Sequence, residues 1–331
     1  MKANRFFILN VFVLLTYVLL VVLSCSDKDD GPDRNPIEKE YFSIKEAEYV
    51  GNDFPQATGS IALDRVNMNR NVLAGGSSVV TLVSERQITE VYVGVVGTAG
   101  YYRYVPGTVR ADEATIYPLV LLISQSLDHS FTIRIAARMA DGEITEIFTS
   151  EIGYIRAGTG ALQISLSFDN EKDVDLYVVQ PDGEVIYYYN EGGYDYELDS
   201  LLWGLDIDSN AGCVIDGINN ENVFYPAEYV QSGKYEVWVN MYSNCRPEIA
   251  TNWVITTIYK NDLIRVTYGQ NPAAGVFPAG TESNPIGGEL TGALKVMEFT
   301  VSGGSRAVIT RTAVRPPLSA SAKKKMEAVR N

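Results

Sequence analysis

Residues 173–189 read DVDLYVVQPDGEVIYYY and contain two runs on either side of Pro181-Asp182-Gly183. In the first run Val174, Leu176 and Val178 alternate with other residues, which is the period of a β-strand with one buried face. Proline followed by aspartate and glycine is typical of a tight turn. The stretch therefore predicts two strands joined by a turn.

The same alternation recurs on both sides of this stretch. ALQISLSF (161–168) precedes it, and GKYEVWVNMYS (233–243) and LKVMEFTV (294–301) follow it. Further upstream, residues 131–152 form two alternating runs around Asp141-Gly142, which is a hairpin signal. Beyond the first 24 residues, the sequence has no convincing run of apolar residues at helical spacing. We therefore expect an all-β chain.

The length of the chain and the spacing of these runs predict two β-sandwich domains in tandem. The runs within 41–156 are short and separated by turn residues, which favours an immunoglobulin-like sandwich. Residues 160–302 predict a second sandwich of the jelly-roll or a related type. IRAGTGA (155–161) is the expected linker between them.

The first 24 residues have the features of an export signal. Lys2 and Arg5 precede an apolar run from Phe6 to Leu23, and Cys25 follows a small residue. This end resembles the lipobox of bacterial lipoproteins, which implies cleavage before Cys25, acylation of that residue and attachment to the outer membrane. Because the run is nearly long enough to span a bilayer, an uncleaved anchor is the alternative.

The residues after Cys25 are acidic. SDKDDGPDRNP (26–36) resembles the tag of Bacteroides-type lipoproteins that reach the outer cell surface, so we expect the protein to face the cell exterior. Residues 25–40 have too few apolar side chains to pack and predict a flexible tether, and 303–331 predict a flexible tail. The formal net charge is −14, and an acidic protein of this kind repels nucleic acid.

Three cysteines are present, and lipidation of Cys25 leaves Cys213 and Cys245. Two cysteines in an exported chain most often pair, so we expect a disulfide between them. Two free thiols are the alternative.

Oxygen-bearing side chains gather around Cys213. Aspartates two residues apart lie on one face of an extended strand, and a D-x-D-x-N run resembles the start of a calcium loop. Oxygen donors with no histidine nearby favour Ca²⁺ over zinc or copper. The candidate ligands are Asp169, Asp173, Asp175, Asp206, Asp208 and Asn210. The alternatives are turn and capping residues that need no metal, and catalytic carboxylates.

An aromatic stretch around a Gly-rich turn offers a second candidate site. Tyr194, Tyr196 and Trp203 lie beside carboxylates, and such side chains can stack on sugar rings and bind their hydroxyls. The alternative is that these aromatics belong to the core and to edge strands, where tyrosine is common.

The order of motifs in the second half carries a resemblance. FDNEKDVDLYV, PDG, LDID, NEN and GKYEV follow one another between residues 160 and 302. This order resembles a family of uncharacterised secreted bacterial β-sandwich domains, and more loosely the pre-peptidase C-terminal domains. The resemblance implies a fold and leaves the activity open. The chain has Asn-Asn-Glu-Asn at 219–222 where the family often has Gly-Pro-Glu-Asn.

Three functions are compatible with these features. The first is a non-catalytic surface lipoprotein that binds a glycan or a protein or serves as an accessory to a larger complex. The second is a structural spacer or assembly component. The third is a carboxylate-based glycoside hydrolase, although the sequence has one histidine and lacks a nucleophile triad or zinc signature.

Overall fold

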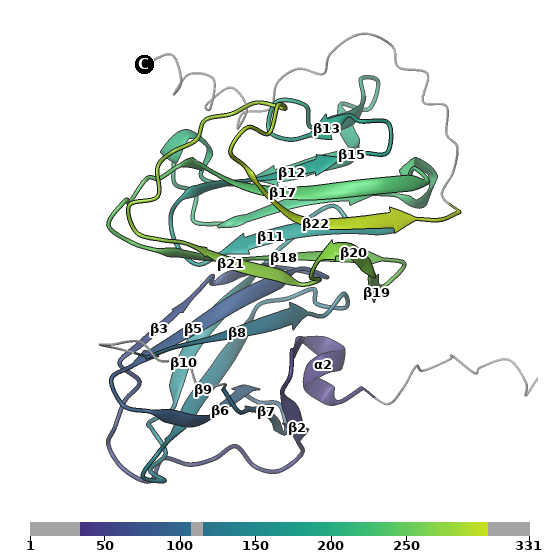
Figure 1. Cartoon of the computed structure of the whole chain (residues 1–331). Coiled ribbons are helices and arrows are strands. Elements are labelled where there is room, and N and C mark those ends of the chain that lie inside the picture. Colours follow the sequence, from purple (N-terminus) through teal and green to yellow (C-terminus); the bar gives the residue numbers. More distant parts are fainter. Residues whose placement is uncertain (1–33, 107–114, 304–331) are drawn as a thin grey trace, which may run out of the picture. The chain divides into compact units, whose positions relative to one another are not determined.

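The computed structural model describes residues 34–106 and 115–303, whose regular secondary structure is almost wholly β-strand (Figure 1). This confirms the predicted all-β class. The export signal, Cys25 and the tail from residue 304 lie outside the described residues, so lipidation and the outer-membrane location stay predictions. Among the described residues, no helix has the length and apolarity needed to cross a membrane.

The first sandwich contains a four-stranded and a six-stranded sheet. The four-stranded sheet has the order β1 (Phe42–Ile44), β8 (Thr115–Ile123), β5 (Ser77–Ser84) and β3 (Arg65–Met68). The six-stranded sheet has the order β2 (Glu48–Val50), β7 (Tyr101–Tyr104), β6 (Ile88–Val95), β9 (Phe131–Met139), β10 (Phe148–Ile155) and β4 (Asn71–Leu73). Alternate residues of the long strands, such as Val80, Leu82, Ile133 and Ile135, form its core.

The first sandwich begins earlier than the sequence predicts. Residues Pro36–Glu40 form the short helix α2, and Ile37 is fully buried in the first core. The predicted tether over 25–40 is therefore wrong for its last five residues. Burial of Ile37 removes a large apolar side chain from water, which helps to fix this segment in spite of its charged neighbours.

The second sandwich contains a seven-stranded and a five-stranded sheet. The larger sheet has the order β14 (Gly192–Asp195), β15 (Ser200–Asp208), β16 (Asn220–Tyr225), β11 (Leu162–Phe168), β18 (Thr251–Tyr259) and β19 (Asp262–Leu263), and β21 (Ala273–Phe277) also pairs with β18. The smaller sheet has the order β13 (Val185–Ile186), β12 (Asp173–Val179), β17 (Gly233–Ser243), β22 (Leu294–Val301) and β20 (Val266–Gly269). The run quoted at the outset thus forms the two predicted strands, β12 and β13, which pair antiparallel.

The predicted linker lies between β10 and β11 and packs against β16. A Cβ added to Gly158 would lie 2.4 Å from the Phe224 ring, and one added to Gly160 would lie 2.2 Å from the backbone oxygen of Tyr225. Real Cβ atoms do not approach other atoms so closely, so these two positions require glycine. The glycines that suggest flexibility in the sequence therefore permit close packing.

The two sandwiches contact each other through β5 on one side and β11 and β18 on the other. The contact is strongly polar: Thr256 Oγ1 donates to Ser77 Oγ at 2.5 Å, and Gln163 Nε2 donates to the backbone oxygen of Ala74 at 3.1 Å. The described residues from Pro36 onward accordingly belong to one compact unit.

Candidate metal site

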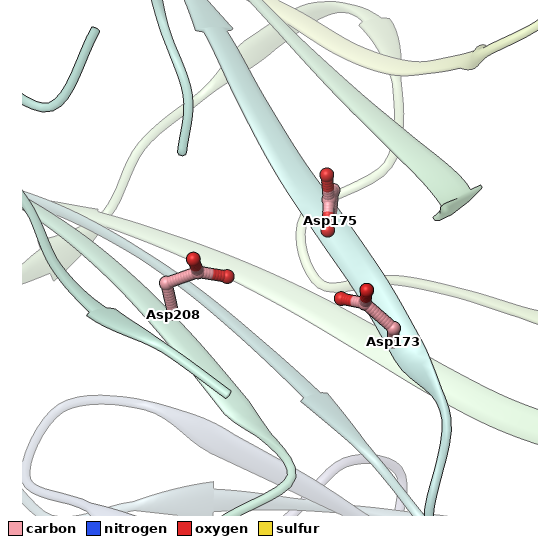
Figure 2. Close-up of side chains that lie close together, drawn as sticks. All are labelled: Asp173, Asp175 and Asp208. Carbon is pink, nitrogen blue, oxygen red and sulfur yellow. The ribbon is translucent and has the colours of Figure 1, made fainter. Parts of the chain in front are cut away.

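Three carboxylates meet beside the start of β12. Asp173 and Asp175 lie on β12 and Asp208 ends β15, and one carboxylate oxygen from each lies within 4.8 Å of the others (Figure 2). Asp173 and Asp175 are 0% and 1% exposed, and Asp208 is partly buried. Like charges this close repel one another in a poorly solvated place, so the arrangement favours a cation or a shared proton.

The local strand geometry explains why these residues meet. β13 pairs only with the far end of β12, at Val178 and Val179, so the first half of β12 lies beside β16 instead. There the Leu176 amide donates to Glu221 Oε2 at 2.6 Å, and Glu221 is the cross-strand partner of Asp208. Glu221 is 1% exposed, which places a fourth acid, also buried, next to the three of the cluster.

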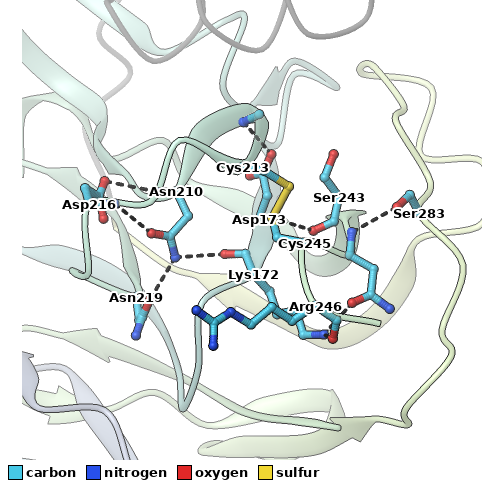
Figure 3. Close-up of a disulfide and its surroundings, with 12 residues drawn as sticks. Lys172, Asp173, Asn210, Cys213, Asp216, Asn219, Ser243, Cys245, Arg246 and Ser283 are labelled. Carbon is cyan, nitrogen blue, oxygen red and sulfur yellow. Dashed lines mark hydrogen bonds between the residues drawn. A yellow bond between two sulfur atoms is a disulfide. The ribbon is translucent and has the colours of Figure 1, made fainter. Parts of the chain in front are cut away.

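Cys213 and Cys245 form the predicted disulfide, with a Cα–Cα distance of 5.5 Å (Figure 3). The bond joins the loop after β15 to the residues after β17. In the same loop the Gly212 amide donates to Asp173 Oδ2 at 2.8 Å, so the crosslinked loop also contacts the acid cluster. The crosslink restricts one wall of the candidate site.

Lys172 precedes the cluster but makes its hydrogen bonds elsewhere. Its ammonium group donates to Asn244 Oδ1 and to the backbone oxygen of Arg246, and burial lowers its pKa. Lys172 therefore connects the start of β12 with the residues on both sides of Cys245 (Figure 3).

Asn210, a predicted ligand, organises the disulfide loop. Its Nδ2 donates to the Lys172 carbonyl at 2.8 Å and to Asn219 Oδ1 at 2.7 Å, while its Oδ1 accepts from the Asp216 amide at 3.1 Å. The residue has a left-handed φ of 57°, which asparagine tolerates. These contacts fit the turn chemistry that the sequence left open as an alternative.

Asp206 lies outside the cluster, although it is two residues from Asp208. The register of the β15–β16 pair shifts between Leu205 and Ile207, and such a bulge reverses the alternation of side chains along a strand. Asp206 Oδ2 accepts from the Gly158 amide at 2.5 Å, and Oδ1 accepts from Asn222 Nδ2 at 2.7 Å. Asp206 therefore fastens the linker.

Asp169 also lies outside the cluster. Oδ1 accepts from the Asn252 amide at 3.0 Å and Oδ2 from Asn252 Nδ2 at 2.6 Å. Burial raises the pKa of Asp169, and these hydrogen bonds oppose the rise. Its role is to join β11 to β18.

The three predicted ligand-binding aromatics do not share one surface. Trp203 is 5% exposed and stacks on Tyr225 in the second core, with ring centroids 5.5 Å apart. Tyr194 and Tyr196 contact each other edge-to-face at 5.4 Å near the tip of the β14–β15 hairpin, where Tyr196 is 47% exposed. Trp203 is therefore not available to a ligand, since strand alternation places it with Leu205 in the core.

Glu221 is the residue that sequence reasoning did not single out. The signal was present in NNEN (219–222), whose four residues are all at most 9% exposed. A fully polar run that is buried in this way requires partners for each side chain. Asn220, for example, donates to the Asn71 carbonyl of the first sandwich at 3.0 Å.

No family model and no curated protein sequence matches the chain. Among solved structures, it is similar to SGBP-B of the Bacteroides ovatus mixed-linkage glucan utilization locus, solved with a mixed-linkage heptasaccharide, at 15% identity and a TM-score of 0.18, covering 57% of this chain and 40% of that one. It is also similar to fibronectin(III)-like modules of Clostridium thermocellum CbhA, at 15% identity and a TM-score of 0.17, covering 62% and 86%. Fervidolysin from Fervidobacterium pennivorans, a keratinolytic enzyme related to subtilisin, matches at 12% identity and a TM-score of 0.17, covering 75% and 34%. The chain thus spans less than half of SGBP-B, and the chemistry of the site rests on its own residues.

Proposed function

We propose that the chain is a non-catalytic cell-surface lipoprotein whose second sandwich, braced by a calcium ion, binds a glycan or a protein. The proposal of a calcium ion rests on one observation, which is that carboxylate oxygens of Asp173, Asp175 and Asp208 lie within 4.8 Å of one another. Calcium takes oxygen ligands at flexible geometry, and these three carboxylates supply them from two different sheets. A supporting role of Glu221 for the same ion is favoured by its pairing with Asp208 and its contact with β12.

A glycosidase role is less well supported by the same residues. Retaining glycosidases hold two carboxyl groups about 5 Å apart, which is close to the spacing in this cluster. The carboxylates of a glycosidase, however, must reach a sugar, whereas Asp173 and Asp175 are buried. Burial suits ligation of a small ion and opposes contact with a saccharide.

A spacer role has one observation in its favour, which is the polar contact between the two sandwiches. That contact would hold the two domains together. The calcium brace is compatible with either role, so the brace and the binding function need separate tests.

Thermal unfolding of the full-length chain in millimolar calcium and then in EDTA tests the brace. A ligand present at 100 times its Kd stabilises a protein by about 2.7 kcal/mol, which predicts a rise of roughly 5–10 °C in Tm. We expect Asp173→Asn and Asp208→Asn to lose the rise. Asp206→Asn is the matched control and should keep it, since Asp206 contacts the linker. An unchanged Tm in calcium would contradict the proposal that calcium stabilises the second sandwich.

A further inference from the structure

The outer face of the five-stranded sheet carries a row of aromatic and charged side chains. Val237 and Val239 of β17 point into the core, so Trp238 between them points outward. Tyr177 of β12 and Lys295 of β22 are the cross-strand partners of Trp238 on its two sides. The Lys295 ammonium lies 5.5 Å from the centre of the Tyr268 ring of β20. β12, β17, β22 and β20 are neighbours in this sheet (Figure 1), so the row crosses four strands.

One end of this row is closed and the other is open. Tyr177 is fully buried, stacks on Tyr187 at 5.6 Å and donates to the backbone oxygen of Ile286 at 3.2 Å. Trp238 is half-buried, whereas Tyr268 is 53% exposed. The accessible part of the row thus runs from β17 over β22 to β20. We call this part, consisting of Trp238, Tyr268 and the charged side chains around them, the aromatic strip.

The charges beside the aromatic strip balance. Lys295 Nζ lies 3.0 Å from Glu236 Oε1 and 2.7 Å from Glu298 Oε2, and Lys234 Nζ lies 2.7 Å from Glu236 Oε1. Hydrogen bonds from these lysines lower the pKa values of Glu236 and Glu298. Both glutamates are therefore ionised at neutral pH, and two cations face two anions. The patch is therefore neutral, although the chain as a whole has a net charge of −14.

We infer that the aromatic strip binds a neutral linear oligosaccharide, an inference that rests on the proposed binding function and gives it a place and a ligand class. Aromatic faces stack on the apolar faces of sugar rings, carboxylates accept hydrogen bonds from sugar hydroxyls, and ammonium groups donate to sugar oxygens. The balanced charges select against both anionic and cationic polymers. β17 and β20 lie two strand spacings apart, about 10 Å, so the ligand must extend beyond a single ring.

Calorimetric titration of the full-length chain tests this inference, with cellohexaose, maltohexaose, xylohexaose and mannohexaose as the neutral probes and a hexamer of galacturonic acid as the anionic one. We expect at least one neutral hexasaccharide to bind and the anionic hexamer not to bind. Trp238→Ala and Tyr268→Ala should each weaken that binding by about tenfold or more, as truncation of an aromatic anchor does. Trp238→Phe should retain part of the affinity, which separates loss of the ring from loss of the fold.

Tyr196→Ala is the matched control, because Tyr196 is an exposed tyrosine on the other sheet. Loss of binding in Tyr196→Ala with full binding in the two strip variants would overturn the inference and leave the binding function in place on the hairpin. The inference would also be overturned if no neutral hexasaccharide bound, or if the anionic hexamer bound equally well. The calcium-dependent rise in Tm is measured without sugar and is unaffected by either result.

Discussion

Asp206 and Asp208 show how strongly a single bulge redirects side chains. The sequence presents them as a D-x-D pair, and the prediction that both contact one ion follows from regular alternation. The extra residue at the bulge sends Asp206 to the linker and leaves Asp208 with Asp173 and Asp175. Bulges leave no regular sequence signal, so this part of the site could not be predicted from the sequence, whereas Asp173, Asp175 and Asp208 themselves were among the predicted ligands.

The carboxyl group of Asp206 gives a prediction about pH. Desolvation raises its pKa from 3.8 to about 6, although the hydrogen bonds from Gly158 and Asn222 oppose the rise. The folded state therefore binds this proton more tightly than the unfolded state, and the group's contribution to stability falls as pH rises from about 4 to about 6. The residue as a whole is exposed, so solvent screening keeps the effect below about 1 kcal/mol.

Urea unfolding of the wild type and Asp206→Asn between pH 4 and pH 7.5 measures this effect. We expect the stability of the wild type relative to the variant to decrease from about pH 4 to about pH 6 and to be constant above about pH 6. A relative stability that increases with pH would contradict the assigned direction of the shift.

At the scale of elements, β15 illustrates what alternation can and cannot predict. The strands of both domains were predictable, because alternating apolar residues have a single sheet face to bury. Which aromatics face the core depends on how the strands assemble, and here Trp203 packs against Tyr225 of the neighbouring strand β16 while Tyr196 stays outside. The glycan-binding trio predicted from sequence therefore divides into one core residue and two hairpin residues.

Substitutions in β15 and its hairpin test this division. Trp203→Ala should reduce the free energy of unfolding by roughly 3–5 kcal/mol, because it opens a cavity in the second core. Tyr196→Ala should change it by no more than about 0.5 kcal/mol. Urea denaturation followed by circular dichroism compares the two, and equal losses would show that Tyr196 is as important to packing as Trp203.

At the scale of the whole molecule, the two sandwiches were predictable and their contact was not. Hydrophobic patterning finds cores, whereas the side chains between the sandwiches are serine, threonine, glutamine and asparagine. In a sequence, polar residues of this kind predict a solvent-exposed surface and give no sign of a contact between domains. The predicted linker lies between β10 and β11, and its glycines pack against β16.

Asn69 is the residue that tests the coupling of the two sandwiches. It is 1% exposed, and its Nδ2 donates to Ser167 Oγ at 3.0 Å and to the Asn219 carbonyl at 2.9 Å. Asn69→Ala should cost about 1–3 kcal/mol, because it leaves these buried acceptors without their donor. We expect calorimetric unfolding to change from one transition to two, whereas Asn52→Ala, at an exposed position, should leave the trace unchanged. A single unshifted transition in Asn69→Ala would show that the sandwiches are held together by other contacts.

The measurement that tests the central claim most directly is calorimetric titration of the EDTA-treated, dialysed full-length chain with calcium. The account predicts one calcium ion per chain, no binding heat in Asp173→Asn or Asp208→Asn, and retained binding in Asp206→Asn. Absence of calcium binding in the wild type, or equal binding in Asp173→Asn, would contradict it and would identify the buried acids as part of a metal-free network.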